Sequence, residues 1–197
     1  MKKKKLLIQD LLGKTGNIDL QMHLVSGDRG LNKEITGSEM NRPGLTLAGF
    51  FDFFAYDRIQ IFGLGETAFL NQLDPEKKRE LYERFFSYSV LCCIFTHNEP
   101  PDELLVKYAS DHAVPILVTK HSTTKFISLA THIIEEVFAP AVSLHGTLVE
   151  VYGIGVLLIG KSGVGKSECA LELVERNHRL VADDIVELPE RRADVGE

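Results

Sequence analysis

The fold of this chain is decided by a run of apolar and glycine residues, Val156-Leu-Leu-Ile-Gly160-Lys-Ser-Gly-Val-Gly165-Lys166-Ser167. An apolar strand over 156–159 precedes the first glycine of the run, and a helix over 165–176 follows the last one. Residues 160–167 match the pattern GxxxxGK[ST] at every fixed position. Glycines let backbone N–H groups point at an anion, and the helix N-terminus adds partial positive charge. The run therefore predicts a phosphate-binding loop.

Two residues at the end of this loop carry specific chemistry. Lys166 can reach the β- and γ-phosphates of a nucleotide, and the Ser167 hydroxyl can join the coordination shell of Mg²⁺. The alternative is a glycine-rich turn that merely joins a strand to a helix, but packing does not require a Lys-Ser pair there. The candidate nucleotide-binding residues are Gly160, Lys161, Ser162, Gly163, Val164, Gly165, Lys166 and Ser167.

Acidic and imidazole side chains flank the loop in the sequence. Asp183 and Asp184 end an expected strand over 179–182, where one carboxylate can hold Mg²⁺ and its neighbour can take a proton from an incoming hydroxyl. The alternative is a turn with two solvated acids. His145 precedes an expected strand over 147–152 and could contact phosphate or move a proton. A histidine beside a glycine is otherwise an ordinary surface residue.

The residues before Pro140 alternate between strand and helix patterns, which predicts an α/β layer with a partly parallel sheet. The segment 58–62 alternates polar and apolar residues, as a half-buried strand does, and Gly63 and Gly65 are expected to end it. A helix is expected to begin at Pro75, with Leu81, Phe85 and Tyr88 on one face. Further strands are expected over 90–95 and 114–118, and further helices over 6–12, 101–110 and 124–138. Pro140 is the expected boundary between a domain over 1–140 and a second region over 141–197.

Composition sets the broad class of protein. The chain has 197 residues, of which 44% are hydrophobic and 25% charged, so it is expected to fold as one domain or two small ones. Its net charge is −6 although Lys2–Lys5 form a basic run, which argues against binding nucleic acid through a basic surface. Three cysteines form no disulfide or zinc pattern, and no segment is typical of a signal peptide or membrane span. A cytoplasmic protein is expected.

The loop and the segments on either side of it resemble the corresponding segments of a known family. The segment Glu150–Leu173 looks like the phosphate-loop segment of bacterial HPr kinase/phosphorylase, and so do its neighbours His145-Gly146 and His178-Arg-Leu-Val-Ala-Asp-Asp184. Near the N-terminus, Asn41-Arg-Pro-Gly-Leu-Thr-Leu-Ala-Gly-Phe50 and Arg58-Ile-Gln-Ile-Phe-Gly63 resemble the same family. Asn177 is a small departure, because the family usually has Gly before this histidine.

The resemblance implies a fold, an activity and partners. It implies an N-terminal α/β domain of unclear role followed by the start of a P-loop kinase domain. The family uses ATP and Mg²⁺ to phosphorylate a serine of the phosphocarrier protein HPr, and it reverses this by phosphorolysis in carbon catabolite regulation. Its members are typically homo-hexamers, with no membrane or nucleic-acid partner expected.

Site residues are also implied by the resemblance. His145, Lys166, Asp183 and Asp184 would form the catalytic group, and Ser167 and Asp183 would bind Mg²⁺. Asp184 would accept the proton of the substrate serine and return it in phosphorolysis.

The family's kinase domain continues past the position of Glu197, so this chain is expected to carry an incomplete kinase domain with little or no phosphoryl transfer. Two alternatives remain open. One is another P-loop NTPase with a different acceptor. The other is a non-catalytic assembly or sensing module with a vestigial nucleotide loop.

Overall fold

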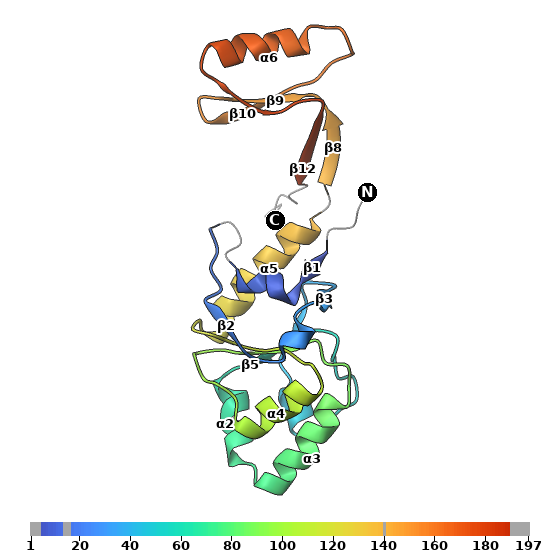
Figure 1. Cartoon of the computed structure of the whole chain (residues 1–197), viewed down its shortest axis with the longest axis vertical. Helices are drawn as coiled ribbons and strands as arrows, with labels where there is room; N and C mark the ends of the chain where they lie inside the picture. The colour runs from blue at the N-terminus through green and yellow to red at the C-terminus, as the bar shows by residue number, and fades with distance from the viewer. Residues whose placement is uncertain (1–4, 14–16, 140, 190–197) are drawn as a thin grey trace, which may run out of the picture. The chain divides into compact units, whose positions relative to one another are not determined.

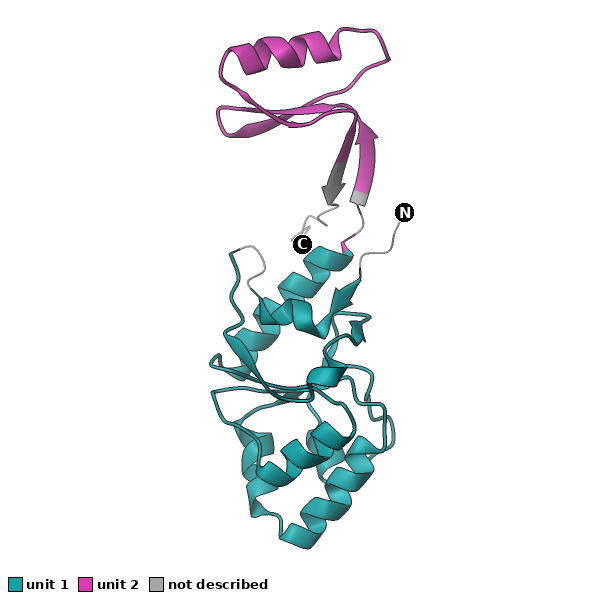
Figure 2. Cartoon of the chain, viewed as in Figure 1, with its two compact units in different colours: residues 1–138 teal, residues 139–197 magenta. Residues whose placement is uncertain are grey.

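The computed structural model describes residues 5–13, 17–139 and 141–189, shown as ribbons in Figure 1. The chain divides into two compact units, residues 1–138 and residues 139–197 (Figure 2). Pro140, the expected boundary, lies outside the described residues. Each unit has its own sheets and is considered by itself.

Unit 1 is built on a five-stranded sheet of mixed direction. Strands β4 to β7 run parallel, and β2 pairs antiparallel with β7 at one edge, in the order β2-β7-β6-β5-β4. Helical connections between adjacent parallel strands build such a sheet. The prediction of an α/β unit with a partly parallel sheet is therefore confirmed. The strands of the sheet are β2 (Met22–Ser26), β4 (Met40–Asn41), β5 (Ile59–Phe62), β6 (Cys92–Phe95) and β7 (Ile116–Thr119).

Helices cover both faces of this sheet (Figure 1). One core packs side chains of α1 to α4 against the sheet, and within it the rings of Phe62 and Phe95 stack with centroids 4.5 Å apart. The opposite core packs α5 against the sheet together with the N-terminal segments. The helices are α1 (Gly44–Leu47), α2 (Leu64–Gln72), α3 (Pro75–Phe86), α4 (Glu103–Asp111) and α5 (Thr123–Phe138), with 3-10 helices η1 (Ile8–Leu12) and η2 (Asp28–Gly30).

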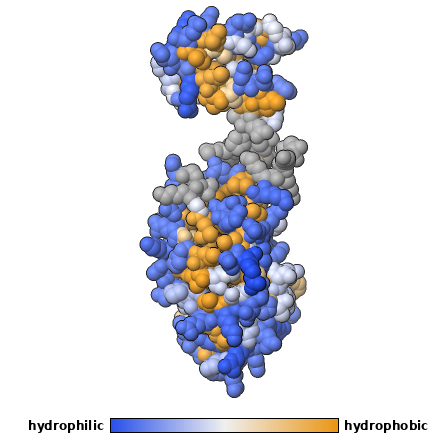
Figure 3. Space-filling view, viewed as in Figure 1, coloured by the Kyte–Doolittle hydropathy of each residue, from blue (hydrophilic) through white to orange (hydrophobic). Residues whose placement is uncertain are grey.

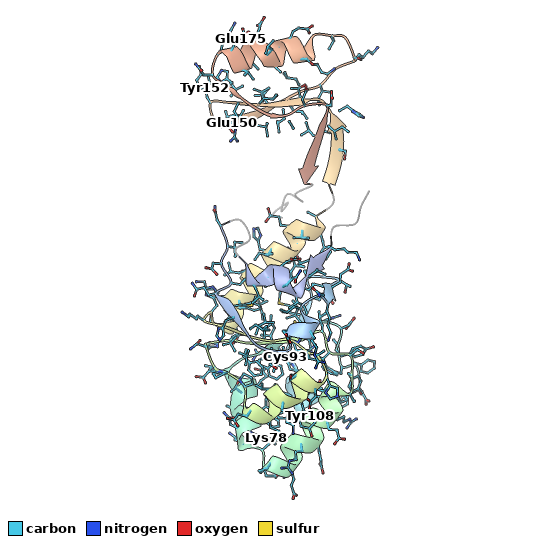
Figure 4. All side chains as sticks on the ribbon, in the orientation of Figure 1. Lys78, Cys93, Tyr108, Glu150, Tyr152 and Glu175 are labelled. Carbon is cyan, nitrogen blue, oxygen red and sulfur yellow. The ribbon has the colours of Figure 1, made fainter. Side chains whose placement is uncertain are left out.

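A polar network joins α3 to α4, and Figure 4 labels one residue of each helix, Lys78 and Tyr108. Asp102 caps α4 by accepting a hydrogen bond from Leu105 N at 2.9 Å. The same carboxylate accepts from Lys78 Nζ at 2.9 Å and from the Tyr82 hydroxyl at 2.8 Å. One cap residue therefore also fixes the packing of the two helices.

The predicted helix over 6–12 is confirmed only over Ile8–Leu12, and there as a 3-10 helix. Leu6–Leu7 form strand β1, which pairs antiparallel with β3 (Glu34–Ile35), and only η1 follows it. The backbone N–H groups of Ile8 and Gln9 donate to the carbonyl oxygens of Lys33 and Leu31, both at 3.1 Å. Both N–H groups therefore bond to a segment that is distant in the sequence. Periodicity in the sequence does not reveal such a pairing.

Strand β5 is fully buried and not half-buried as expected. Gln60 is 0% exposed because its amide donates to the carbonyl oxygens of Ala55 and Arg58 and accepts from Asn41 Nδ2. Helix α2, which was not expected, begins directly after Gly63 because the Glu66 carboxylate accepts a hydrogen bond from the Gly63 N–H. Tyr88 lies beyond the end of α3 at Phe86, so only the other two predicted face residues are on that helix. The remaining predicted strands and helices begin within two residues of their expected positions.

The described residues of unit 2 form two antiparallel sheets and one helix. Strands β9 (Thr147–Val151), β10 (Ile154–Leu158) and β11 (Arg179–Ala182) form a sheet in the order β10-β9-β11. Strands β8 (Ala141–His145) and β12 (Ile185–Pro189), which the sequence analysis missed, form a two-stranded sheet. Helix α6 (Lys166–Glu175) packs on β9 and β11.

Two side-chain contacts join the end of the β9-β10 hairpin to the start of β11. Figure 4 labels the two hairpin residues, Glu150 and Tyr152. Arg179 donates to the Glu150 carboxylate at 2.8 Å, and the ring of Tyr152 meets that of His178 at 4.9 Å between centroids. Unit 2 nevertheless leaves many large apolar side chains exposed, seen as orange surface in Figure 3. They include Ile154, Val156, Ile159, Leu171, Leu180 and Val181.

Candidate functional site

The predicted phosphate loop lies between β10 and α6. Gly163 and Gly165 have φ angles of +81° and +93°, a region that favours glycine. A Cβ on Gly160 would lie 2.9 Å from Cγ1 of Val164, an exposed side chain that has room to move. Gly163 and Gly165 therefore allow the loop to turn tightly into the first turn of α6.

The loop forms one wall of a cavity of about 450 Å³. A cavity of this size lies within the range of small-molecule sites. The opposite walls come from the turn between β8 and β9 and from the turn between β11 and β12. The lining residues are His145, Gly146, Thr147, Gly160, Ser162, Gly163, Gly165, Lys166, Ser167, Glu168, Asp183 and Asp184.

Lys166 is folded back onto its own loop. Its ammonium donates to the carbonyl oxygens of Gly160 and Lys161, each at 2.9 Å. Its neighbour Ser167 lies in the first turn of α6, where backbone N–H groups have no partner within the helix. These free donors and the ammonium place positive potential at the cavity.

The two aspartates differ in their surroundings. The Asp183 carboxylate accepts a hydrogen bond from the Thr147 hydroxyl at 2.7 Å and another from the Asp184 N–H at 3.1 Å. Asp184 adopts a left-handed conformation with φ +68°, and its carbonyl oxygen accepts from Gly146 N–H at 3.2 Å. No side chain among the described residues contacts the Asp184 carboxylate through a hydrogen bond or ion pair. Asp183 is thus held by the protein, whereas Asp184 lines the cavity and its carboxylate has no hydrogen-bond partner among the described residues.

His145 ends β8 and is paired in register with Ile185 of β12. Its exposed ring lines the cavity beside the two aspartates. The next residue is Gly146, and a glycine fits here because the chain passes very close to β10. A Cβ on Gly146 would lie 2.6 Å from the Leu158 carbonyl oxygen. This close approach brings His145 and the phosphate loop to one cavity.

The structure brings nearly all the predicted site residues together. The four candidate catalytic residues, His145, Lys166, Asp183 and Asp184, line one cavity together with Ser167. Lys161 and Val164 belong to the loop but do not line that cavity. The sequence analysis missed Thr147 and passed over the role of Gly146, because their partners Asp183 and Leu158 are distant in sequence.

The donor set fits a magnesium ion bound together with phosphates. The Ser167 hydroxyl and the Asp183 carboxylate face the same cavity, and Mg²⁺ prefers a few protein oxygens with the rest of its shell from water and phosphate. No group of three or more His, Cys, Asp or Glu side chains is placed to hold a metal ion in the part of the chain that the structure describes.

Fold and site together define an α/β protein with a glycine-rich loop of the pattern GxxxxGK[ST] between a strand and a helix. Residues 6–134 match the family described as HPr Serine kinase N terminus, and residues 136–197 match the HPr Serine kinase C-terminal domain. The chain therefore belongs to the HPr serine kinase family, which confirms the resemblance found in the sequence. Within residues 5–13, 17–139 and 141–189, no helix is long and apolar enough to cross a membrane.

Relatives with the same family name are similar over most of the chain. The HPr kinase/phosphorylase of Leptospira biflexa is 52% identical over 170 residues, 86% of this chain and 53% of the relative. That of Treponema pallidum is 48% identical over 169 residues, again 86% of this chain and 53% of the relative. This chain thus spans about half the length of the curated relatives it matches.

One solved structure shows a weak likeness. The CBS and DRTGG domains of the regulatory region of Clostridium perfringens pyrophosphatase superpose with a TM-score of 0.36 and 14% identity. The match covers 58% of this chain and 44% of the other. A likeness of this size decides nothing about fold or function here.

Proposed function

We propose that this chain takes part in ATP-dependent phosphorylation of a serine on HPr and in its reversal by phosphorolysis. One observation carries the proposal: Lys166, Ser167, His145 and the Asp183-Asp184 pair all line one cavity at the phosphate loop. The relatives named HPr kinase/phosphorylase have the activity that such a cavity suits. By family we also propose a cytoplasmic homo-hexamer that acts in carbon catabolite regulation.

The residues divide the work by their chemistry. The loop, from Gly160 to Ser167, binds the phosphates of ATP through backbone N–H groups, and Lys166 neutralises their charge. Ser167 and Asp183 hold Mg²⁺, which supplies charge neutralisation on the phosphates when bound. Asp184, whose carboxylate is free, accepts the proton of the substrate serine and returns it in phosphorolysis. His145 lies where it can contact the transferred phosphoryl group.

The two regions have separate roles. Residues 1–140 form an N-terminal α/β domain, and residues 141–197 form the N-terminal part of a P-loop kinase/phosphorylase domain. The exposed apolar side chains on the β9-β10-β11 sheet and on α6 support the second assignment, because a kinase domain would cover them with further layers.

A binding measurement and a transfer measurement test the proposal. The chain is titrated with ATP in the presence of Mg²⁺, and phosphate transfer to HPr is followed with labelled ATP. Lys166→Ala is compared with Lys161→Ala, which removes the same charge from the same loop at a residue outside the cavity. We expect the first variant to lose ATP binding and the second to retain it. Equal binding and equal transfer by the wild type and Lys166→Ala would overturn the assignment.

A second candidate is nucleotide hydrolysis with a different acceptor. It would be favoured by ATP turnover that is independent of HPr and is abolished by Lys166→Ala.

A further inference from the structure

A threonine at the base of the site makes a contact that packing alone does not require. Thr147 is the first residue of β9 and is 2% exposed. Its hydroxyl donates to Asp183 Oδ1 at 2.7 Å, across 36 residues of sequence. Valine has nearly the same shape and a high preference for strands, so burial in β9 would be satisfied without a hydroxyl. The hydroxyl therefore points to a role that involves Asp183.

The contact decides which oxygen of Asp183 is available. Oδ1 accepts from the Thr147 hydroxyl and from the Asp184 N–H at 3.1 Å, whereas Oδ2 accepts no hydrogen bond from any described residue. Two donors on one oxygen fix the rotation of the carboxylate about its Cα–Cβ and Cβ–Cγ bonds. Asp183 lines the cavity, and its second oxygen is then held in one orientation as well.

The backbone around the pair is fixed by the same turn. Gly146 N–H donates to the Asp184 carbonyl oxygen, and Leu148 is paired in register with Ala182. The residues on either side of Thr147 thus tie β9 to the two ends of the Asp183-Asp184 turn. Thr147 adds a side-chain hydrogen bond from β9 to this turn.

We propose that Thr147 is a positioning residue that orients Asp183 so that Oδ2 meets the magnesium ion of the bound nucleotide. The inference rests on the proposed function, since it concerns the metal side of the same site. Hydrogen-bond partners of metal ligands orient the ligand and commonly alter metal affinity by ten- to a hundredfold when removed. Thr147 does not touch the nucleotide in this scheme and acts only through Asp183.

The test measures metal dependence separately from nucleotide binding. ATP affinity is measured in EDTA and over a Mg²⁺ titration for the wild-type chain, Thr147→Val and Thr147→Ser. We expect Thr147→Val to raise the Mg²⁺ concentration for half-maximal ATP binding by about tenfold. ATP affinity in EDTA should be unchanged, and Thr147→Ser, which keeps the hydroxyl, should behave as the wild type. Thermal unfolding of each variant monitors the fold, and Thr147→Ala replaces Thr147→Val if the latter does not fold.

A double-variant cycle separates this inference from the proposed function. In an Asp183→Asn background, Thr147→Val should cause no further change in Mg²⁺ dependence, because its effect passes through Asp183. The role of Thr147 would be overturned if Thr147→Val had the same Mg²⁺ dependence of ATP binding as the wild type while Asp183→Asn had lost that dependence. The proposed function would then still stand. That role would also be overturned if Thr147→Val lost as much ATP affinity in EDTA as it loses in Mg²⁺. If Asp183→Asn has no effect and Lys166→Ala binds ATP normally, the proposed function itself fails.

Discussion

The ammonium nitrogen of Lys166 lies 2.9 Å from the carbonyl oxygen of Gly160, at the opposite end of the phosphate loop. The loop is therefore closed by its own lysine, and a second bond to Lys161 O completes the contact. In the proposed nucleotide complex, the Lys166 ammonium would exchange these neutral acceptors for charged phosphate oxygens. Hydrogen bonds between charged partners are the stronger ones, so the exchange favours the bound state.

Lys166→Ala is expected to lower ATP affinity by at least about tenfold, because a charge-assisted hydrogen bond contributes roughly 1.5–3 kcal/mol. Lys161→Ala should change ATP affinity by less than about fivefold, since a surface charge contributes about 1 kcal/mol or less. Isothermal titration of each chain with ATP and Mg²⁺ gives both numbers. A similar loss in the two variants would mean that charge, and not position in the loop, determines binding.

Gly146→Ala tests the close approach between the β8-β9 turn and the end of β10. The added Cβ would lie 2.6 Å from the Leu158 carbonyl oxygen, so the backbone must shift. We expect a loss of about 1–3 kcal/mol in the free energy of unfolding of unit 2, which is typical of overpacking. ATP binding should weaken as well, because the shift moves His145 and the Asp183-Asp184 turn away from the loop.

Gly155→Ala is the matched control for that variant. Gly155 lies in β10 of the same sheet, and its added Cβ would meet only Leu148 Cδ1, at an ordinary contact distance of 3.7 Å. Urea unfolding and ATP titration should show little change. If both glycine variants were equally destabilised, the clash with Leu158 would not be the cause.

The parts of the fold that were predictable from the sequence are those with local causes. Helix α3 begins at Pro75 because Asp74 caps it, and its apolar face recurs at helical spacing. The phosphate loop is a contiguous pattern whose glycines carry the positive φ angles. Strand β1 depends on a partner strand more than twenty-five residues away, and the hydrogen bond that the Gln60 side chain accepts comes from Asn41, 19 residues away; periodicity encodes neither.

The candidate site likewise has residues that a local pattern predicts and residues that depend on distant partners. Lys166 and Ser167 are recognisable because the loop pattern is local, whereas the contact of Thr147 with Asp183 joins residues 36 positions apart. A threonine at the start of an apolar strand is an ordinary strand residue until the other end of the contact is known. The sequence contains the donor and the acceptor, but only the pairing of β9 with β11 brings them together.

Stability at low pH is expected to depend on Arg42 and Glu66. Arg42 donates to both carboxylate oxygens of Glu66, at 3.1 and 2.9 Å, and the Glu66 side chain is 7% exposed. Burial alone would raise the pKa of Glu66, but the hydrogen bonds from Arg42 and Gly63 outweigh it and lower the pKa below its ordinary value of 4.5. A lowered pKa stabilises the fold above that value, and the contribution disappears as the pH falls through the folded-state pKa.

Arg42→Met should therefore lower the free energy of unfolding at pH 7 by about 2 kcal/mol, since it leaves a buried carboxylate without its charged partner. The difference from the wild type should shrink as the pH falls towards the lowered pKa of wild-type Glu66, because the unpaired Glu66 of the variant takes up its proton at a higher pH than the paired one. Arg58→Met serves as the control, because its partner Glu39 is 71% exposed and such surface pairs contribute less than about 1 kcal/mol. Urea unfolding from pH 7 to pH 3 gives the comparison, and a constant difference across that range would contradict the role of Glu66.

Thiol reactivity is expected to separate the three cysteines by burial. Cys92 and Cys93 lie in the central strand β6 and are 0% exposed, and burial raises the pKa of Cys92 to about 12. Cys169, in the first turn of α6, is exposed. Only the thiolate is nucleophilic, so a raised pKa and lack of access both protect the buried pair. Ellman's reagent should therefore modify one thiol rapidly in the native chain and three in guanidinium chloride. Cys169→Ser should remove the fast reaction, and a fast thiol remaining in that variant would show that β6 opens readily in the native chain.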